Sequence, residues 1–356
     1  MINERILRLQ SELNDGEAAL IISDINRLYY TGFTSSAGYL AVTQDSAELL
    51  VDFRYYEAAT SKVKCCRVTL FGRLYEQLGK IFSAKHVKTV FLETEYVSIS
   101  KLADLRDKLP GFEISDDGRV QQLILRQRSV KSKEEIACIK AAQRITDDAF
   151  GYILGKIRPG ISEKQIALDM EFFMRREGSE GTAFDFIAVS GKNSSLPHGV
   201  PTDKLIEKGD FVTMDYGAVC GGYRSDMTRT VAVGSVCERQ KEVYETVLRA
   251  QEAAFEQIRP GAVCRDVDAA ARSLIADAGY GGCFGHGLGH SVGLEIHESP
   301  ACNTLCETPL EPGMIMTVEP GIYIENEFGV RIEDMAVVTK DGFIDITQSK
   351  KELIIL

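Results

Sequence analysis

Three of the chain's five histidines lie in one glycine-rich segment, residues 285–297. Glycine at this density lets the backbone pass close to a ligand or to another segment, at a cost in conformational entropy. Imidazole binds metals and transfers protons near neutral pH. One histidine in such a segment would suggest an ordinary turn. Three indicate a functional site, provided that other parts of the chain supply matching carboxylates.

Carboxylates occur at matching positions in two related halves of the later part of the chain. The tetrapeptide Ile-Arg-Pro-Gly at residues 157–160 is repeated at residues 258–261. Downstream, Asp215 and Glu319 each lie six residues after one glycine and two residues before another. The repeat indicates that these carboxylates occupy equivalent positions in two related half-domains.

A second carboxylate follows in each half. Asp226 and Glu333 each come two residues after an arginine, which in the second half is Arg331. Adjacent strands place side chains next to one another on one face, where like charges repel. Two half-domains related by pseudo-symmetry therefore predict a cleft with four carboxylates. The strand-like runs that flank these residues are 211–214, 229–233, 314–318 and 330–338.

Divalent cations would relieve this repulsion. Four carboxylates with one imidazole form an oxygen-rich, moderately hard donor set that suits Mn²⁺, Fe²⁺ or Co²⁺. Two such ions about 3.5 to 4 Å apart can share a water, lower its pKa and polarise a carbonyl group. Each motif alone is typical of a turn or a surface strand. The duplicated set, with the histidine segment between its halves, favours metal-assisted hydrolysis.

The elements that must position these residues follow from hydrophobic patterning. Early in the chain, short apolar runs alternate with amphipathic ones, which predicts an α/β layer. A basic run at residues 126–133 leads into a capping box of Ser132 and Glu135, where a new helix should begin. We therefore predict a first domain at residues 1–127 and a second at residues 128–356. The predicted strands are 18–22, 39–42, 47–51, 68–71 and 89–92. The predicted helices are an opening helix that stops at residues 14–16, followed by 55–63, 74–83 and 100–109.

Composition narrows the class of protein. With 356 residues, 44% hydrophobic and 26% charged, the chain is typical of a soluble protein of two domains. Its net charge of −11 argues against nucleic acid as a partner, and we expect no membrane partner. The N-terminus lacks the pattern of a signal peptide, and nine cysteines without a CxxC pair are typical of reduced thiols. We expect a cytoplasmic protein.

The combined motifs resemble those of the pita-bread metallopeptidases, which include aminopeptidase P, prolidase and methionine aminopeptidase. The first domain resembles the creatinase-type N-terminal domain of the proline-specific branch. The resemblance implies an α/β (α+β) fold, with a creatinase-like α/β domain followed by a pseudo-twofold catalytic domain whose curved antiparallel sheet is covered by helices. The motifs are Asp215 with Asp226, His-Gly-Leu-Gly-His at 286–290, Thr-Val-Glu-Pro-Gly at 317–321 and Val-Arg-Ile-Glu-Asp at 330–334.

The resemblance also implies a ligand set for two divalent metal ions. Asp215 would bind one ion, His290 and Glu319 the other, and Asp226 and Glu333 would bridge both. All five residues are present. Mn²⁺ is the expected metal, with Co²⁺ or Zn²⁺ as alternatives.

Further residues match catalytic positions of the family. His198 and His297 would hold the substrate and stabilise the oxyanion, while Glu319 would accept or relay the proton of the attacking water. His286 matches a further active-site histidine, and Arg331 matches the arginine beside the bridging glutamate. Without the resemblance, His198 would be interpreted as an ordinary loop residue.

The expected reaction is hydrolysis of the N-terminal Xaa-Pro bond of peptides by attack of metal-bound hydroxide. Strict prolidase, which cleaves only Xaa-Pro dipeptides, is the main alternative. Some prolidases carry an arginine where this chain has Ala301, which favours aminopeptidase P. Methionine aminopeptidase lacks such a first domain. Metal-free creatinase-like hydrolases and non-enzymatic peptide-binding modules would be expected to lose metal ligands. The family resemblance suggests a homodimer.

Overall fold

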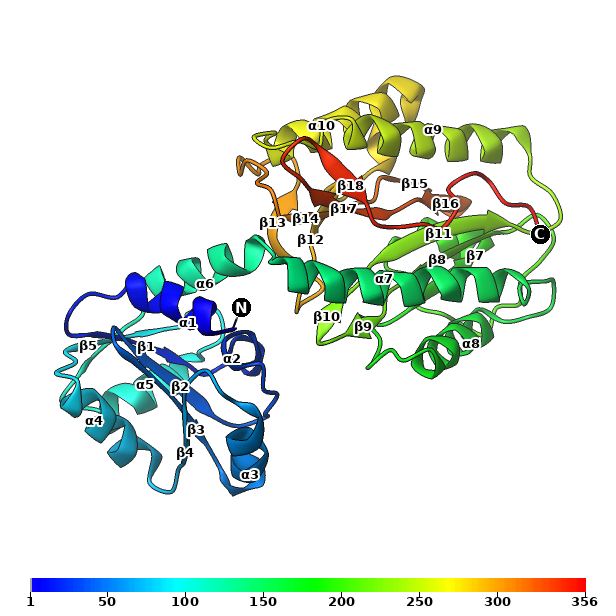
Figure 1. The fold of residues 1–356 in the computed structure, drawn as a ribbon. Helices are drawn as coiled ribbons and strands as arrows, with labels where there is room; N and C mark the ends of the chain where they lie inside the picture. Colours follow the sequence, from blue (N-terminus) through cyan, green and yellow to red (C-terminus); the bar gives the residue numbers. More distant parts are fainter. Residues whose placement is uncertain (1) are drawn as a thin grey trace. The chain divides into compact units, whose positions relative to one another are not determined.

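The computed structural model describes residues 2–356 of the chain. These residues form two compact units, of which the first ends at Gln127 and the second begins at Arg128. None of the helices in residues 2–356 combines the length and the apolar composition that crossing a membrane requires. Figure 1 shows the helices and strands of each unit.

The first unit is built on a mixed six-stranded sheet in the order β4-β3-β2-β1-β5-β6. All the strands and helices predicted here from the hydrophobic pattern are present, with small shifts at their ends. Two helices, α2 and α6, were not predicted. The strands are β1 (Glu17–Ile21), β2 (Tyr39–Thr43), β3 (Ser46–Val51), β4 (Arg67–Leu70), β5 (Thr89–Leu92) and β6 (Glu113–Ser115). The helices are α1 (Ile2–Ser11), α2 (Asp24–Thr31), α3 (Phe53–Lys62), α4 (Leu74–Ala84), α5 (Ile99–Lys108) and α6 (Arg119–Ser129).

The second unit places its strands between two pairs of helices, α7 with α8 and α9 with α10 (Figure 1). The predicted capping box is present at the start of α7, where the Ser132 hydroxyl accepts from the Glu135 N–H and the Glu135 carboxylate accepts from the Ser132 N–H. The helices are α7 (Lys133–Leu154), α8 (Glu163–Arg176), α9 (Glu238–Phe255) and α10 (Cys264–Ile275), with short helical turns η1 (Gly191–Ser195), η2 (Ala276–Tyr280) and η3 (Gly281–Cys283).

The duplicated halves seen in the sequence appear as two similar strand arrangements. In the first half β8 pairs with β7 and β11, and the β9–β10 hairpin lies between β8 and β11 in sequence. In the second half β14 pairs with β17, which pairs with β18, and the β15–β16 hairpin lies between β14 and β17. The strands of the first half are β7 (Ile187–Ser190), β8 (Phe211–Tyr216), β9 (Val219–Cys220), β10 (Tyr223–Arg224) and β11 (Met227–Ala232). The later strands are β12 (Gly289–Ser291), β13 (Glu298–Cys302), β14 (Ile315–Val318), β15 (Gly321–Ile324), β16 (Phe328–Arg331), β17 (Asp334–Val338) and β18 (Phe343–Asp345).

One predicted strand is wrong in its extent. The run 330–338 is divided between β16 and β17, which end at Arg331 and begin at Asp334. The break has a physical reason, because β16 pairs with β15 whereas β17 pairs with β14. At the break, the Glu333 N–H donates to the Thr228 carbonyl of the other half at 3.1 Å. The change of partner leaves the Glu333 side chain at the junction of the two halves.

Candidate metal centre

The first pair of predicted ligands lies at one end of the β8–β11 ladder. Asp215 is in β8, directly opposite Thr228 of β11. Asp226 immediately precedes β11, and both carboxylates are buried. Antiparallel pairing therefore brings together two residues that are separated in sequence by the β9–β10 hairpin.

The second pair occupies the equivalent end of the β14–β17 ladder. Glu319 directly follows β14, and Glu333 directly precedes β17, whose first residue Asp334 is opposite Val318. The Glu319 N–H donates to the Leu288 carbonyl at 2.8 Å, which ties this turn to the glycine-rich segment. The two halves thus contribute their carboxylates from corresponding strand ends.

His290 faces this carboxylate cluster from β12. Its Nε2 lies 3.6 Å from Asp226 Oδ2 and 3.4 Å from Glu319 Oε1. Its Nδ1 is 3.1 Å from the Ser291 carbonyl, which can only accept a hydrogen bond. With the proton on Nδ1, the lone pair of Nε2 is directed at carboxylate oxygens, which is the arrangement expected around a cation.

Burial dominates the electrostatics of the site. It raises the pKa of Asp226 and of Glu333 well above the usual carboxyl range, and nearby carboxylates add to the effect. Burial also raises the pKa of Glu319 to about 8. Burial, with His297 nearby, lowers the pKa of His290 to about 4. The neutral imidazole of His290 therefore does not offset the negative charge of the carboxylates. A bound cation would offset that charge.

Two observations support the fit of these residues to a divalent metal. Asp226, His290 and Glu333 each offer a ligand atom, and these atoms all lie within 4.8 Å of one another. Among the described residues, Asp215 Oδ1, Asp226 Oδ1 and Glu333 Oε1 are buried without a hydrogen-bond partner. Buried carboxylate oxygens without donors carry a large desolvation cost. Hard divalent cations accept this kind of donor set.

The cluster lies in a cavity of about 890 Å³ in the second unit. His198 and His297 also line this cavity, and both side chains are exposed there. The His297 and His290 rings meet edge to face, with their centroids 4.5 Å apart. Much of the remaining wall is apolar and includes Leu168, Phe184, Phe186, Ile187, Val200 and Ile296. The cavity therefore offers polar groups at the carboxylates and a nonpolar surface beside them.

His286 lines the same cavity, but its ring nitrogens are already engaged. Nδ1 is 2.7 Å from the Gly287 carbonyl, and Nε2 is 2.9 Å from the Tyr323 hydroxyl. Arg331 Nη1 donates to that hydroxyl at 2.7 Å, and Arg331 Nη2 donates to Asp215 Oδ2 at 2.5 Å. A chain of contacts thus runs from His286 to a predicted metal ligand. Tyr323, which the sequence analysis missed, is its central member.

Thr228 is a second residue that sequence reasoning missed. Its Oγ1 donates to Glu333 Oε2 at 2.7 Å and accepts from Arg331 Nε at 3.0 Å. Its position two residues after Asp226 was the available signal, since alternate residues of a strand share a face. Thr228 therefore joins a carboxylate of the second half to β11 of the first half.

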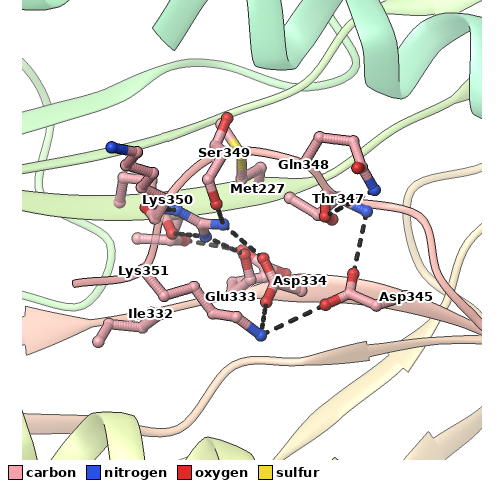
Figure 2. Close-up of polar contacts among 12 residues, drawn as sticks. Met227, Ile332, Glu333, Asp334, Asp345, Thr347, Gln348, Ser349, Lys350 and Lys351 are labelled. Carbon is pink, nitrogen blue, oxygen red and sulfur yellow. Dashed lines mark hydrogen bonds and ion pairs between the residues drawn. The ribbon is translucent and has the colours of Figure 1, made fainter. Parts of the chain in front are cut away.

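A buried cluster of charged side chains contacts the backbone of Glu333. Figure 2 shows Asp334 and Lys351 of this cluster. Arg229 Nη2 donates to Asp334 Oδ1 at 2.6 Å, and Arg229 Nη1 donates to the Glu333 carbonyl at 2.6 Å. Arg229 also donates to the carbonyls of residues 349 and 350, and Lys351 Nζ lies 2.6 Å from Asp334 Oδ2. The C-terminal segment is thereby attached to the backbone of a predicted ligand.

The basic run predicted at the domain boundary contains buried charges. Arg128 Nη2 lies 2.5 Å from Glu298 Oε1, and Lys131 Nζ lies 3.2 Å from Glu298 Oε2. Lys131 Nζ also donates to Ser291 Oγ at 2.7 Å. Ser291 and Glu298 belong to the β12–β13 hairpin that contains His290. The run therefore holds the histidine hairpin in place, which its polar composition did not predict.

Comparison with known proteins agrees with this architecture. Residues 137–340 match metallopeptidase family M24, and residues 5–130 match the creatinase/prolidase N-terminal domain. A creatinase-type domain followed by a carboxylate-lined, pseudo-twofold unit defines a pita-bread metallopeptidase. The chain belongs to metallopeptidase family M24. The predicted family, fold class and enzyme class are thus confirmed.

Relatives lie on both sides of the dipeptidase and aminopeptidase division. The Xaa-Pro dipeptidase of Pyrococcus furiosus is 38% identical over 354 residues, which cover 99% of each chain. The structure of an Xaa-Pro dipeptidase from Bacillus anthracis is 40% identical, with a TM-score of 0.95 and 100% of both chains covered. The structure of an X-Pro aminopeptidase from Thermotoga maritima is 35% identical, with a TM-score of 0.92 and coverage of 98% of this chain and 100% of that one.

Proposed function

We propose that this metallopeptidase hydrolyses the N-terminal Xaa-Pro bond of peptides with two divalent metal ions. The residues that would hold the ions are Asp215 on one, His290 and Glu319 on the other, and Asp226 and Glu333 on both. The observation that carries this proposal is the convergence of buried carboxylate oxygens without donors around a neutral imidazole. Two ions would balance the four negative charges.

The oxygen-rich donor set favours Mn²⁺, with Co²⁺ or Zn²⁺ as alternatives. When bound, such ions polarise a carbonyl group and lower the pKa of water. Glu319 would accept or relay the proton of the water, because its carboxylate belongs to the cluster that would hold the ions and lies 3.4 Å from His290 Nε2.

His198 and His297 are proposed to contact the peptide itself. Both line the cavity that contains the carboxylates, and both residues are exposed. A ring N–H donated to the scissile carbonyl oxygen would hold the substrate and stabilise the charge that develops on that oxygen. Arg331 and His286 have different proposed roles, since Arg331 fixes Asp215 and His286 supports Arg331 through Tyr323.

The apolar wall of the cavity suits a proline substrate. The proline nitrogen of an Xaa-Pro bond carries no hydrogen, and its ring presents a rigid nonpolar surface. Phe184, Phe186 and Ile187 give the cavity nonpolar surface for such a ring. The relatives named above, an X-Pro aminopeptidase and Xaa-Pro dipeptidases, support the same bond specificity.

The residue at position 301 leads us to favour the aminopeptidase activity over the strict dipeptidase activity. A dipeptidase has to bind the free carboxylate of the proline. Ala301 lines the cavity and supplies no cation there, and the buried Arg331 is already paired with Asp215. A longer peptide places an amide at that point and requires no charged partner.

The test is a peptide panel with Mn²⁺, Co²⁺ and Zn²⁺ added in turn to metal-free protein. An Xaa-Pro-Xaa tripeptide should be cleaved with a higher kcat/KM than the matching Xaa-Pro dipeptide, and an Xaa-Ala-Xaa tripeptide should be cleaved poorly. Faster cleavage of the dipeptide would favour prolidase. The absence of proline dependence would reject the bond specificity.

We further propose a cytoplasmic homodimer without nucleic-acid or membrane partners. All nine cysteines are free thiols in the described residues, which supports a reducing compartment. The net charge of −11 does not favour binding to phosphates. Light scattering on the purified protein would measure the oligomeric state.

A further inference from the structure

The position of His198 depends on the backbone that carries it. Its side chain is exposed, and its ring makes no hydrogen bond within residues 2–356. Neither burial nor a hydrogen bond within residues 2–356 therefore fixes the ring in the cavity. What determines its position is the segment from Ser190 to Thr202, which we call the His198 loop.

Glu163 holds both ends of the His198 loop. At the first end, Glu163 Oε1 accepts from the Ser190 N–H at 2.7 Å, from Ser190 Oγ at 2.9 Å and from Asn193 Nδ2 at 3.1 Å. At the other end, Glu163 Oε2 accepts from the Thr202 N–H at 3.0 Å and from Thr202 Oγ1 at 2.6 Å. One carboxylate thus accepts hydrogen bonds from both ends of the His198 loop, at Ser190 and at Thr202.

The surroundings of Glu163 suit an ionised carboxylate. It is fully buried at the start of α8, where the helix dipole favours negative charge. Lys204 Nζ donates to Ser190 Oγ at 2.9 Å, and Ser190 Oγ in turn donates to Glu163 Oε1 at 2.9 Å. Every hydrogen-bonding partner of the carboxylate is a donor. An amide at this position would direct its own N–H groups at other donors.

The middle of the loop is tied to the catalytic strands. Ser194 Oγ accepts from the Gly329 N–H at 2.9 Å. The Pro197 carbonyl accepts from Arg331 Nη1 at 3.2 Å, one residue before His198. These two contacts place the loop beside the predicted ligands, but they do not fix its ends. Backbone contacts also hold the ends, since Ser190 pairs with Val212 of β8 and the Thr202 carbonyl accepts from the Lys164 N–H at 3.1 Å. The Glu163 carboxylate adds a side-chain connection between the two ends.

We infer that Glu163 is a positioning residue for His198. It fixes His198 in the active-site cavity by accepting hydrogen bonds from both ends of the His198 loop. This inference rests on the role of His198 in the proposed function. Misplacing a substrate-holding group by about 1 Å can reduce the rate about 100-fold. The loss should appear in kcat rather than in metal content, because Glu163 makes no hydrogen bond to a predicted ligand.

The main variant is Glu163→Gln in the full-length, metal-loaded protein, assayed on the best Xaa-Pro peptide. Glu93→Gln is the matched control, since Glu93 is also fully buried and accepts from Ser23 Oγ at 2.6 Å and from Asn26 Nδ2 at 2.6 Å, but lies in the first unit. E163Q should lower kcat about 10- to 100-fold. E93Q should keep kcat within about 2-fold of the wild type at a similar loss of thermal stability.

Two further measurements separate positioning from simple destabilisation. Hydrogen exchange of residues 191–201 should be faster in E163Q than in the wild type and unchanged in E93Q. In a double-mutant cycle, the E163Q/H198A protein should be as active as H198A within about 2-fold, because Glu163 acts through His198. If E163Q does not fold, Thr202→Val removes a single donor and should show a smaller loss with the same non-additivity.

The inference would be overturned if residues 191–201 exchanged hydrogen at the wild-type rate in E163Q. It would also be overturned if the fold-losses in kcat of E163Q and H198A multiplied in the double variant. Failure of the proposed function looks different. In that case the wild type does not cleave Xaa-Pro peptides, or H198A retains full activity. The hydrogen-exchange experiment still decides whether Glu163 holds the ends of the His198 loop, since hydrogen exchange does not depend on turnover.

Discussion

At the scale of single residues, the site depends on charges that are kept out of water. Asp226 and Glu333 are buried, and each has an oxygen without a donor among the described residues. The nearby cation, Arg331, donates to Asp215 and to the Thr228 hydroxyl. The carboxylates of the bridging positions are therefore left for metal ions, and the neutral side chains around them set their orientation.

Replacing Glu319 by Gln should lower kcat at least about 100-fold, because the amide cannot accept the proton of the attacking water. The free energy of unfolding of the metal-free protein should change by less than about 1 kcal/mol or increase, since burial already disfavours the ionised carboxyl. Steady-state kinetics and urea unfolding measure the two quantities. Near-normal turnover would refute the role of Glu319.

Replacing Thr228 by Val should weaken metal binding about 10-fold or more, because Glu333 loses the hydroxyl that donates to its Oε2. Titration calorimetry of the metal-free protein with Mn²⁺ measures this affinity directly. Thr213→Val is the control, since the buried Thr213 hydroxyl hydrogen-bonds only to the Thr230 hydroxyl within residues 2–356. Equal effects of both substitutions on affinity would contradict a specific role of Thr228.

At the scale of elements, three of the five predicted ligands stand directly before or after a strand. Asp226 and Glu333 precede β11 and β17, and Glu319 follows β14. Strand ends leave side chains free to turn into a shared space, while the ladders behind them stay rigid. The C-terminal segment adds to this rigidity through Arg229 and Lys351 (Figure 2).

The cluster behind Glu333 predicts a pH dependence of stability. Burial, with Asp334 nearby, raises the pKa of Asp345 to about 6, although the Thr347 N–H and Lys351 oppose the shift. The folded protein thus binds this proton more tightly than the unfolded chain does. The stabilising contribution of the protonated carboxyl is complete below about pH 4 and is lost as the pH rises through about 6.

The Asp345→Asn variant isolates this effect, because Asn cannot ionise. Between pH 4 and pH 7, the free energy of unfolding of the variant should rise relative to that of the wild type. Urea titrations of both proteins across this range provide the comparison. A constant difference would show that the pKa of Asp345 is not raised, and a change of opposite sign would show that its pairing with Lys351 dominates.

At the scale of the whole molecule, metal binding and stability of the second unit are linked. A metal at about 100 times its dissociation constant stabilises the folded state by about 2.7 kcal/mol. For a domain of this size, that shift raises Tm by roughly 5 to 10 °C. Scanning calorimetry with and without Mn²⁺, Co²⁺ or Zn²⁺ measures it. The Glu333→Gln variant should respond less, and no response of the wild type to any of the three ions would reject the metal site.

The sequence by itself determined the duplicated carboxylates, the histidine segment and most elements of the first unit. These features are local or periodic, so that spacing and alternation reveal them. Asp215 and Glu319 are recognisable as equivalents because the repeats around them survive in the amino-acid order. The family resemblance then supplied roles, such as that of His198, that spacing alone did not indicate.

Only the tertiary structure revealed the residues that hold this site together. Thr228, Tyr323 and Glu163 contact residues 105, 37 and 39 positions away, respectively, in the chain. No local pattern encodes a hydrogen bond of that range, because its geometry depends on how separate strands pair and where they break. The division of the run 330–338 between β16 and β17 has the same cause, since each strand found a different partner. The polar run before α7 likewise contains Lys131, whose buried charge is explained only by Glu298 of a distant hairpin.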